Sequence, residues 1–293
     1  MKSPNAIGLK FFCGVVAAAV ASTCLVSTAY CFSLEDLNPF GKSKYEMKLD
    51  PDVPADRLYN EGLIRMEKKD YETAAKTFAD LQKQYPFSQW ARKALLMEVY
   101  AYYQAGSYTE TVSSSNRYIS LYPNSPDAPY VTYLAGVSLF GDLPDVNRDQ
   151  DRVTQAIKYF QTVVDKYPKS EYVADARFKI QVARDQLAGH EMNVGRYYLQ
   201  RKNYTAAINR FREVLFKYQN TRESEEALER LTEAYLAMGI VDEAQTAAAV
   251  LGHNYPESEW YKEALDRLKT DGYAPQDHQD SWISKVFRKV GMT

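Results

Sequence analysis

The sequence predicts an all-α protein: an α-solenoid of about five stacked helical hairpins, with an extra long helix before the fourth. Two observations support this prediction. The first is a glycine, an alanine and a phenylalanine that recur at the same offsets, as Gly62, Ala74 and Phe78 and again as Gly195, Ala207 and Phe211. The second is a recurring tyrosine–proline end to each unit, at Tyr85-Pro86, Tyr122-Pro123, Tyr167-Pro168 and Tyr255-Pro256, with Tyr218-Gln219 as a degenerate copy.

Small residues followed by a bulky one and a helix-ending proline, in a unit of about 34 residues, form the tetratricopeptide pattern. Two antiparallel helices can touch where Gly62 and Ala74 let their backbones approach, and Phe78 fills the space beside them. One hairpin cannot bury its own apolar face, so copies must stack. Four of the ends continue as Tyr-Pro-x-Ser, and each serine hydroxyl is expected to cap the next helix; these serines are Ser88, Ser125, Ser170 and Ser258.

The first three hairpins follow from this register. Residues 56–85 form the first, with helices expected at 57–68 and 71–85, and residues 88–122 form the second, with Gly106 ending its first helix. The third begins near Asp127 and carries the pattern at Gly136, Ala156 and Phe160. Because the distance from Gly136 to Ala156 is longer than in the other units, an insertion is expected within residues 141–151.

The second half begins with the extra helix, at residues 170–187, which is amphipathic at helical spacing. Gly189 is expected to kink or break it before a separate helix at 190–201, the first of hairpin four. Hairpin five covers residues 224–255, with Gly239 ending its first helix. A capping helix at 259–268 is needed to cover the last apolar face.

The last segment with a helical pattern is a basic amphipathic tail. As a helix it places Trp282, Ile283, Val286, Phe287 and Val290 on one face, with lysines and arginine elsewhere. Such a tail suits an anionic membrane surface or a groove on a partner. The alternative is that it folds back onto its own solenoid.

The N-terminus has the pattern of an export signal. Residues 1–10 carry two lysines, and residues 11–26 are apolar but short for a membrane span. Cleavage after Ala29 would release a soluble chain, whereas processing before Cys24 or Cys31 would attach a lipid; neither cysteine follows a good lipoprotein box. The predicted domains are therefore an export signal (1–31), an extended tether (32–55), the solenoid (56–269), and a linker with the basic tail (270–293).

Composition and motifs favour a binding protein. A net charge of −2 gives no bulk field that would attract nucleic acid. The three cysteines all lie in the first 31 residues, so the rest of the chain offers neither a disulfide nor a thiolate. The histidines are isolated, and no nucleophile elbow or phosphate loop occurs. We predict a chain without catalytic residues, cofactor or metal.

Several short motifs together resemble the BamD family, the tetratricopeptide lipoproteins of the machinery that assembles β-barrels into bacterial outer membranes. The resemblance spans about residues 52–268 and rests on the segments Leu58-Tyr59-Asn60, Tyr85-Pro86-Phe87, Tyr100-Ala101-Tyr102-Tyr103, Asn147-Arg148-Asp149, 190–198 and Ala207-Ile208-Asn209-Arg210. It implies five repeats, a periplasmic location and a lipid anchor in the outer membrane. It also implies that the C-terminal repeats bind the barrel subunit, BamA, beside accessory lipoproteins, and that the N-terminal repeats receive unfolded outer-membrane proteins.

The resemblance also implies which residues bind. Asn209 and Arg210 match a family position implicated in the barrel-subunit contact; the alternative for Arg210 is an exposed helix charge. The region of the substrate groove contains Tyr59, Tyr85, Phe87, Tyr102 and Tyr103; for Tyr85 and Tyr102 the alternative is core packing. We therefore predict a non-catalytic assembly scaffold at the periplasmic face of the outer membrane.

Two other functions remain open from the sequence. The first is a periplasmic coordinator of cell-wall synthesis or division, although residues 32–55 lack the coiled-coil heptads that such a protein usually has. The second is an envelope hydrolase with an unusual site.

Overall fold

The computed structural model describes residues 53–141 and 150–290, which belong to one compact unit. The predicted export signal, with Cys24 and Cys31, lies outside this range, as do the tether up to residue 52 and the central part of the insertion. The described residues form twelve helices and no strand, so the all-helical prediction is confirmed. These helices are α1 (Ala55–Glu67), α2 (Tyr71–Gln84), α3 (Ala91–Gln104), α4 (Tyr108–Leu121), α5 (Ala128–Gly141), α6 (Gln150–Lys166), α7 (Val173–Gln200), α8 (Tyr204–Lys217), α9 (Glu223–Ala237), α10 (Val241–Asn254), α11 (Glu259–Thr270) and α12 (Trp282–Val290).

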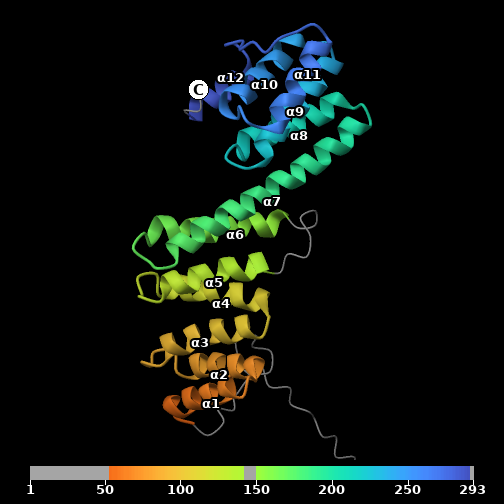
Figure 1. Ribbon diagram of the computed structural model, residues 1–293. Coiled ribbons are helices and arrows are strands. Elements are labelled where there is room, and N and C mark those ends of the chain that lie inside the picture. Colours follow the sequence, from red (N-terminus) through yellow and green to blue (C-terminus); the bar gives the residue numbers. More distant parts are fainter. Residues whose placement is uncertain (1–52, 142–149, 291–293) are drawn as a thin grey trace, which may run out of the picture. The chain divides into compact units, whose positions relative to one another are not determined.

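Each helix from α1 to α10 packs mainly against its neighbours in the chain, as antiparallel pairs (Figure 1). The pairs α1–α2, α3–α4, α5–α6, α7–α8 and α9–α10 are the five predicted hairpins. The core is therefore a series of small clusters, each shared by adjacent helices, and the largest cluster reaches from α7 to α12. This is the expected consequence of stacking units that cannot bury their apolar faces alone.

The glycine–phenylalanine pairs hold three of these hairpins together. A Cβ atom on the glycine would overlap the ring of the phenylalanine on the partner helix in each. The distance from that Cβ to the ring Cε1 atom would be 2.5 Å for Gly62 and Phe78, 2.7 Å for Gly136 and Phe160, and 2.4 Å for Gly195 and Phe211. All three rings are fully buried. The small residue is required because the ring occupies the space where a side chain would lie.

The extra helix differs from its prediction. Residues 173–200 form one continuous helix, α7, so the predicted break at Gly189 is wrong. Ala188 and Met192 on either side of this glycine are buried in the core cluster that α7 shares with α8. Their packing offsets the intrinsic cost of glycine inside a helix, about 1 kcal/mol relative to alanine. The N-terminal half of α7 packs on α6, and its C-terminal half forms hairpin four with α8.

The connections between hairpins share one pattern of backbone hydrogen bonds. In the first, the Ser88 amide donates to the Tyr85 carbonyl at 3.1 Å, and the Ser88 carbonyl accepts from the Ala91 amide at 3.1 Å. The same pair of bonds recurs at Ser125, Ser170 and Ser258. The hydroxyls of Ser88 and Ser258 are buried without a hydrogen-bond partner among the described residues, so the predicted side-chain cap is wrong at both. At Ser170 the hydroxyl does accept from the Tyr172 amide at 3.3 Å, just before α7.

The turns inside hairpins one, two, four and five contain a residue in the left-handed conformation that the sequence predicted for glycine. Gly106 and Gly239 have φ of 74° and 73°. Lys69 and Lys202 hold the matching places in hairpins one and four, with φ of 61° and 59°. A non-glycine residue in this region costs about 1–3 kcal/mol, which the packing of the two helices must offset.

None of the helices in the described ranges is long and apolar enough to cross a membrane.

Candidate functional site

The surface of α8 brings together the residues predicted to bind a partner. Its buried face, which includes Ala207, Phe211 and Val214, packs into the core shared with α7 and α9. At its start, the Asn203 side chain accepts a hydrogen bond from the Ala206 amide at 3.3 Å and caps the helix. These contacts fix α8 so that Asn209 points outward.

Asn209 and Arg210 line a hollow of about 260 Å³, together with Tyr198, Ala206 and Glu213. Arg210 Nη1 donates to Glu191 Oε2 on α7 at 3.1 Å. The Arg210 side chain keeps 43% of its surface exposed, whereas that of Glu191 keeps 15%. A half-exposed arginine of this kind can keep one bond to its own chain and offer its remaining donors to a carboxylate on a partner.

The N-terminal aromatic residues divide into two groups. Phe87 is fully exposed in the connection after α2. Tyr59, Tyr85 and Tyr102 are half-buried against the core cluster of α1 to α3, and Tyr103 packs on the next cluster. Among the predicted groove residues, Phe87 therefore has the most surface free for a substrate.

The contacts of these tyrosines show how far they serve packing. The ring of Tyr59 lies 4.9 Å from that of Trp90 and 5.6 Å from that of Phe78, between centroids. Tyr85 Oη donates to the Val53 carbonyl at 3.0 Å. Burial raises the pKa of the Tyr59 and Tyr102 phenols. Their rings help to hold hairpin one to hairpin two, and only their edges face solvent.

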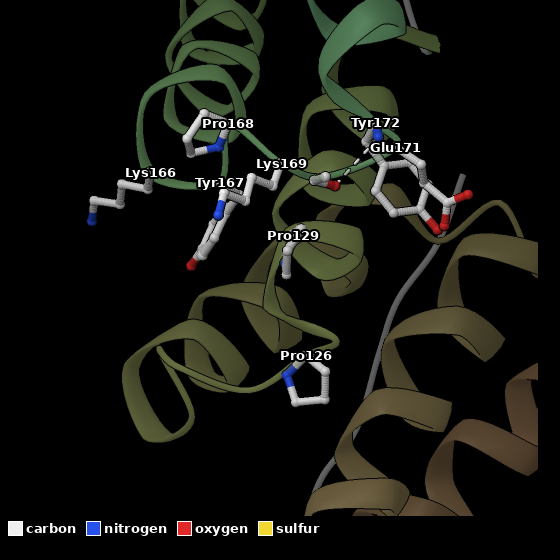
Figure 2. A pocket seen from close by; sticks show the side chains of 9 residues that line it. Pro126, Pro129, Lys166, Tyr167, Pro168, Lys169, Glu171 and Tyr172 are labelled. Carbon is white, nitrogen blue, oxygen red and sulfur yellow. Dashed lines mark hydrogen bonds between the residues drawn. The ribbon is translucent and has the colours of Figure 1, made fainter.

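A hollow that the sequence analysis missed lies where the α4–α5 and α6–α7 connections meet (Figure 2). Its volume is about 520 Å³, and its lining includes Pro126, Pro129, Tyr167, Pro168 and Tyr172. The signal for it was present, since these residues stand in or beside the repeating Tyr-Pro-x-Ser ends. Three prolines and two tyrosines supply its apolar surface, and Lys166, Lys169, Ser170 and Glu171 complete the lining.

Tyr172 links this hollow to a row of phenols. Its ring stacks on that of Tyr133 with 5.1 Å between centroids, and lies 5.7 Å from that of Tyr130. Burial, with the neighbouring phenols Tyr100, Tyr172 and Tyr103, raises the pKa of Tyr130 to about 12. Tyr133 donates to the Asp175 carboxylate, and burial followed by this bond raises the pKa of its phenol.

The most deeply buried carboxylate of the described residues belongs to a structural ion network. Glu229 on α9 has no exposed surface and lies 2.7 Å from Arg267 Nε on α11 and 3.1 Å from Arg230 Nη1. Burial raises the pKa of Glu229, although the two arginines oppose that shift. The network ties the capping helix α11 to α9. This structural role is sufficient to explain why Glu229 is buried and why its pKa is raised.

The tail helix corrects the prediction that its apolar face is free for a membrane or a partner. Trp282–Val290 is helical as predicted, but Ile283 and Phe287 are completely buried in the core cluster that contains α10. Trp282 and Val286 pack at the edge of that cluster. The tail has therefore folded back onto its own solenoid, the alternative that the sequence left open. The Val290 side chain lies outside the described residues.

No group of histidine, cysteine, aspartate and glutamate residues within 53–141 and 150–290 could hold a metal ion.

Comparison with known proteins covers the same helices. The family model described as "YfiO: Outer membrane lipoprotein" matches residues 51–251, which run from the start of α1 into α10. A protein named "Outer membrane protein assembly factor BamD" from Caulobacter vibrioides is 41% identical over 235 residues, covering 80% of this chain and 77% of that protein. The chain belongs to the YfiO/BamD family.

Two further relatives carry the BamD name. The protein from Rickettsia prowazekii is 42% identical over 217 residues, which is 74% of this chain and 86% of the relative. The protein from Xylella fastidiosa strain 9a5c is 34% identical over 223 residues, which is 73% of this chain and 76% of the relative.

Membership confirms the family resemblance seen in the sequence, the class of non-catalytic outer membrane protein assembly factor, and the location as an outer membrane lipoprotein. Family membership therefore favours the assembly factor over the two alternative functions considered from the sequence, the cell-wall coordinator and the envelope hydrolase. The BamD family model ends before α11 and α12, so the tail helix lies outside the matched range.

Proposed function

We propose that this chain is a scaffold of the outer-membrane assembly complex that holds the barrel subunit, BamA, on α8 and receives unfolded outer-membrane proteins at its N-terminal repeats. The contact with the barrel subunit is supported by the hollow beside Arg210, which Asn209, Tyr198 and the half-exposed Arg210 guanidinium line together. Arginine and tyrosine are enriched where partners bind tightly. Accessory lipoproteins of the same complex are the further partners that we expect.

The binding of unfolded outer-membrane proteins at the N-terminal repeats is supported by the exposed aromatic surface around hairpins one and two. Phe87 offers a whole ring to solvent, and Tyr59, Tyr85, Tyr102 and Tyr103 offer ring edges with hydroxyl groups. Aromatic surfaces give large contact area at low entropic cost, which suits unfolded segments of varied sequence. Binding at both ends of one solenoid would pass a substrate to the barrel subunit.

Attachment to the membrane completes the proposal. We propose a lipid on Cys24 or Cys31, joined to the solenoid in the periplasm by the tether that the sequence predicts before α1, which begins at Ala55. Replacing each cysteine by serine in turn, and measuring the mass of the mature chain, would identify the anchor. Loss of the lipid mass with one substitution only is the expected result, and an unlipidated wild-type chain would contradict it.

The test of the α8 contact compares Arg210→Gln with Glu191→Gln. If Arg210 binds the barrel subunit, its replacement lowers copurification of that subunit, because the partner loses a charge-assisted bond worth about 1.5–3 kcal/mol. Glu191→Gln removes the partner of Arg210 within the chain and leaves the guanidinium available, so recovery should be maintained. Equal loss in both variants would mean that Arg210 only supports the packing of α7 on α8.

A further inference from the structure

A second exposed group lies on α8 next to the Arg210 hollow. Phe216 keeps 52% of its surface exposed, and its ring stacks on that of Trp282 from α12 with 5.4 Å between centroids and 15° between planes. The Arg212 guanidinium lies over both rings, 4.9 Å from the Trp282 centroid and 5.5 Å from the Phe216 centroid. We refer to Arg212, Phe216 and Trp282 as the aromatic platform.

The tail is held firmly enough to complete this platform. Trp282 Nε1 donates to Tyr235 Oη on α9 at 3.0 Å. The Ser281 hydroxyl donates to Glu243 Oε2 on α10 at 2.5 Å, and Gln245 Nε2 donates to the Ala274 carbonyl at 2.7 Å. Together with the buried side chains of α12, these bonds place Trp282 against the C-terminal part of α8, beside Arg212 and Phe216.

Positive side chains lie on and beside the platform, and two of them, Lys285 and Arg288, donate hydrogen bonds to backbone carbonyls of their own segment. No carboxylate in the described part of the chain forms an ion pair with Arg212, Lys285, Arg288 or Lys289, all of which are exposed. Lys285 and Lys289 lie at helical spacing on the edge of α12 that also bears Trp282. A partner that covers the platform would therefore gain from presenting a carboxylate beside an apolar side chain.

The platform is continuous with the α8 hollow. Asn209, Arg212 and Phe216 are spaced so that they form one stripe along the exposed side of α8, and Asn209 also lines the hollow that contains Arg210. Arginine, tryptophan and other aromatic residues are the side chains that dominate binding energy at interface centres. A partner seated on the hollow would reach the platform without leaving α8.

We propose that Arg212, Phe216 and Trp282 form a second contact area for the barrel subunit, to which the tail helix supplies Trp282. The occupant is a folded surface of that subunit that bears an acidic residue beside an apolar one. This inference rests on the proposed function, since it extends the contact at Arg210 along α8 to Trp282, which lies beyond the residues that the family model matches.

The test is a titration of the detergent-solubilised barrel subunit against the immobilised full-length chain. Phe216→Ala and Arg212→Gln should each raise the Kd about tenfold, the change typical of a contact residue at an interface centre. Both side chains are exposed, so these variants should fold normally. Matched controls are Phe178→Ala, an aromatic residue 66% exposed on α7, and Arg201→Gln, whose guanidinium lies 4.4 Å from the Tyr197 centroid. Neither control should change the Kd.

Unchanged affinity in Phe216→Ala and Arg212→Gln, with loss of affinity in Arg210→Gln, would overturn the platform and leave the proposed function intact. Unchanged affinity in all three would overturn both. If Phe216→Ala and Arg212→Gln instead weakened attachment to anionic phospholipid vesicles at constant Kd for the subunit, the platform would belong to the membrane and this proposal would be wrong.

Discussion

Replacing Gly195 by alanine tests how the hairpins are held together. In an open helix this change stabilises, because alanine is favoured over glycine by about 1 kcal/mol. At Gly195 the new Cβ would lie 2.4 Å from Phe211 Cε1, with two more ring atoms of Phe211 within 2.9 Å. Overpacking a buried ring costs about 1–3 kcal/mol, and overlap this close should reach the upper end. We expect a net loss of about 2 kcal/mol in the free energy of unfolding.

Gly189→Ala is the matched control on the same helix. A Cβ at Gly189 meets nothing within 4 Å, so this variant should gain about 0.5–1 kcal/mol. Urea unfolding followed by far-ultraviolet circular dichroism measures both variants, and thermal unfolding should show Gly195→Ala melting about 4–8 °C below wild type. In a Phe211→Ala background the ring is gone, and Gly195→Ala should then stabilise. If Gly195→Ala stabilised the wild-type chain as Gly189→Ala does, the ring would not be what requires the glycine.

Three further outcomes are expected. The free energy of unfolding should fall as pH rises from 10 to 12, because the unfolded Tyr130 phenol then loses its proton while the folded phenol, with its pKa raised to about 12, keeps it. Tyr130→Phe should flatten this pH dependence in urea titrations. An unchanged pH dependence would contradict the raised pKa of Tyr130. Arg117→Ala should cost about 2–3 kcal/mol, because the buried Glu98 on α3 loses its ion pair at 2.5 Å with this half-exposed arginine but keeps its hydrogen bonds from Gln82 and Ser114. Glu98→Gln should cost only about 1 kcal/mol, and equal losses in urea unfolding would contradict this. Phe87→Ser should change stability by less than about 0.5 kcal/mol yet lower the affinity for an unfolded outer-membrane protein; unchanged affinity would remove Phe87 from the substrate surface.

The repeat pattern predicted the packing because the same physical demand returns in each hairpin. Gly62, Gly136 and Gly195 could be recognised from their spacing to a phenylalanine, and the structure places each beside that ring. The glycines at the hairpin turns were predictable for a similar reason, since a left-handed residue is needed there. Lys69 and Lys202 show that the turn keeps its conformation even where glycine is missing.

The predictions that failed depended on contacts between distant segments. The sequence gives the amphipathic pattern of α12, but whether Ile283 and Phe287 face a membrane or α10 depends on the free surface of α10, which no local pattern reports. Gly189 looked like a break because its local preference is against helix, whereas buried neighbours on both sides keep α7 continuous.

Tyrosine was the residue type least resolved by sequence. Tyr59 and Tyr102 suit a groove and a core equally, since each has an apolar ring and a polar tip. The structure assigns most of their rings to the contact between hairpins one and two, and leaves Phe87 as the exposed aromatic residue of that region. The aromatic platform was beyond sequence analysis because it joins α8 to the last helix of the chain.

The measurement that tests the central claim most directly is a mild-detergent purification of the tagged full-length chain from native envelopes, with copurifying proteins identified by mass. We predict recovery of a large outer-membrane barrel protein with periplasmic domains, and a reduced yield of it with Arg210→Gln but not with Glu191→Gln. Recovery of cell-wall synthesis or division proteins in place of the barrel protein would contradict the assembly scaffold.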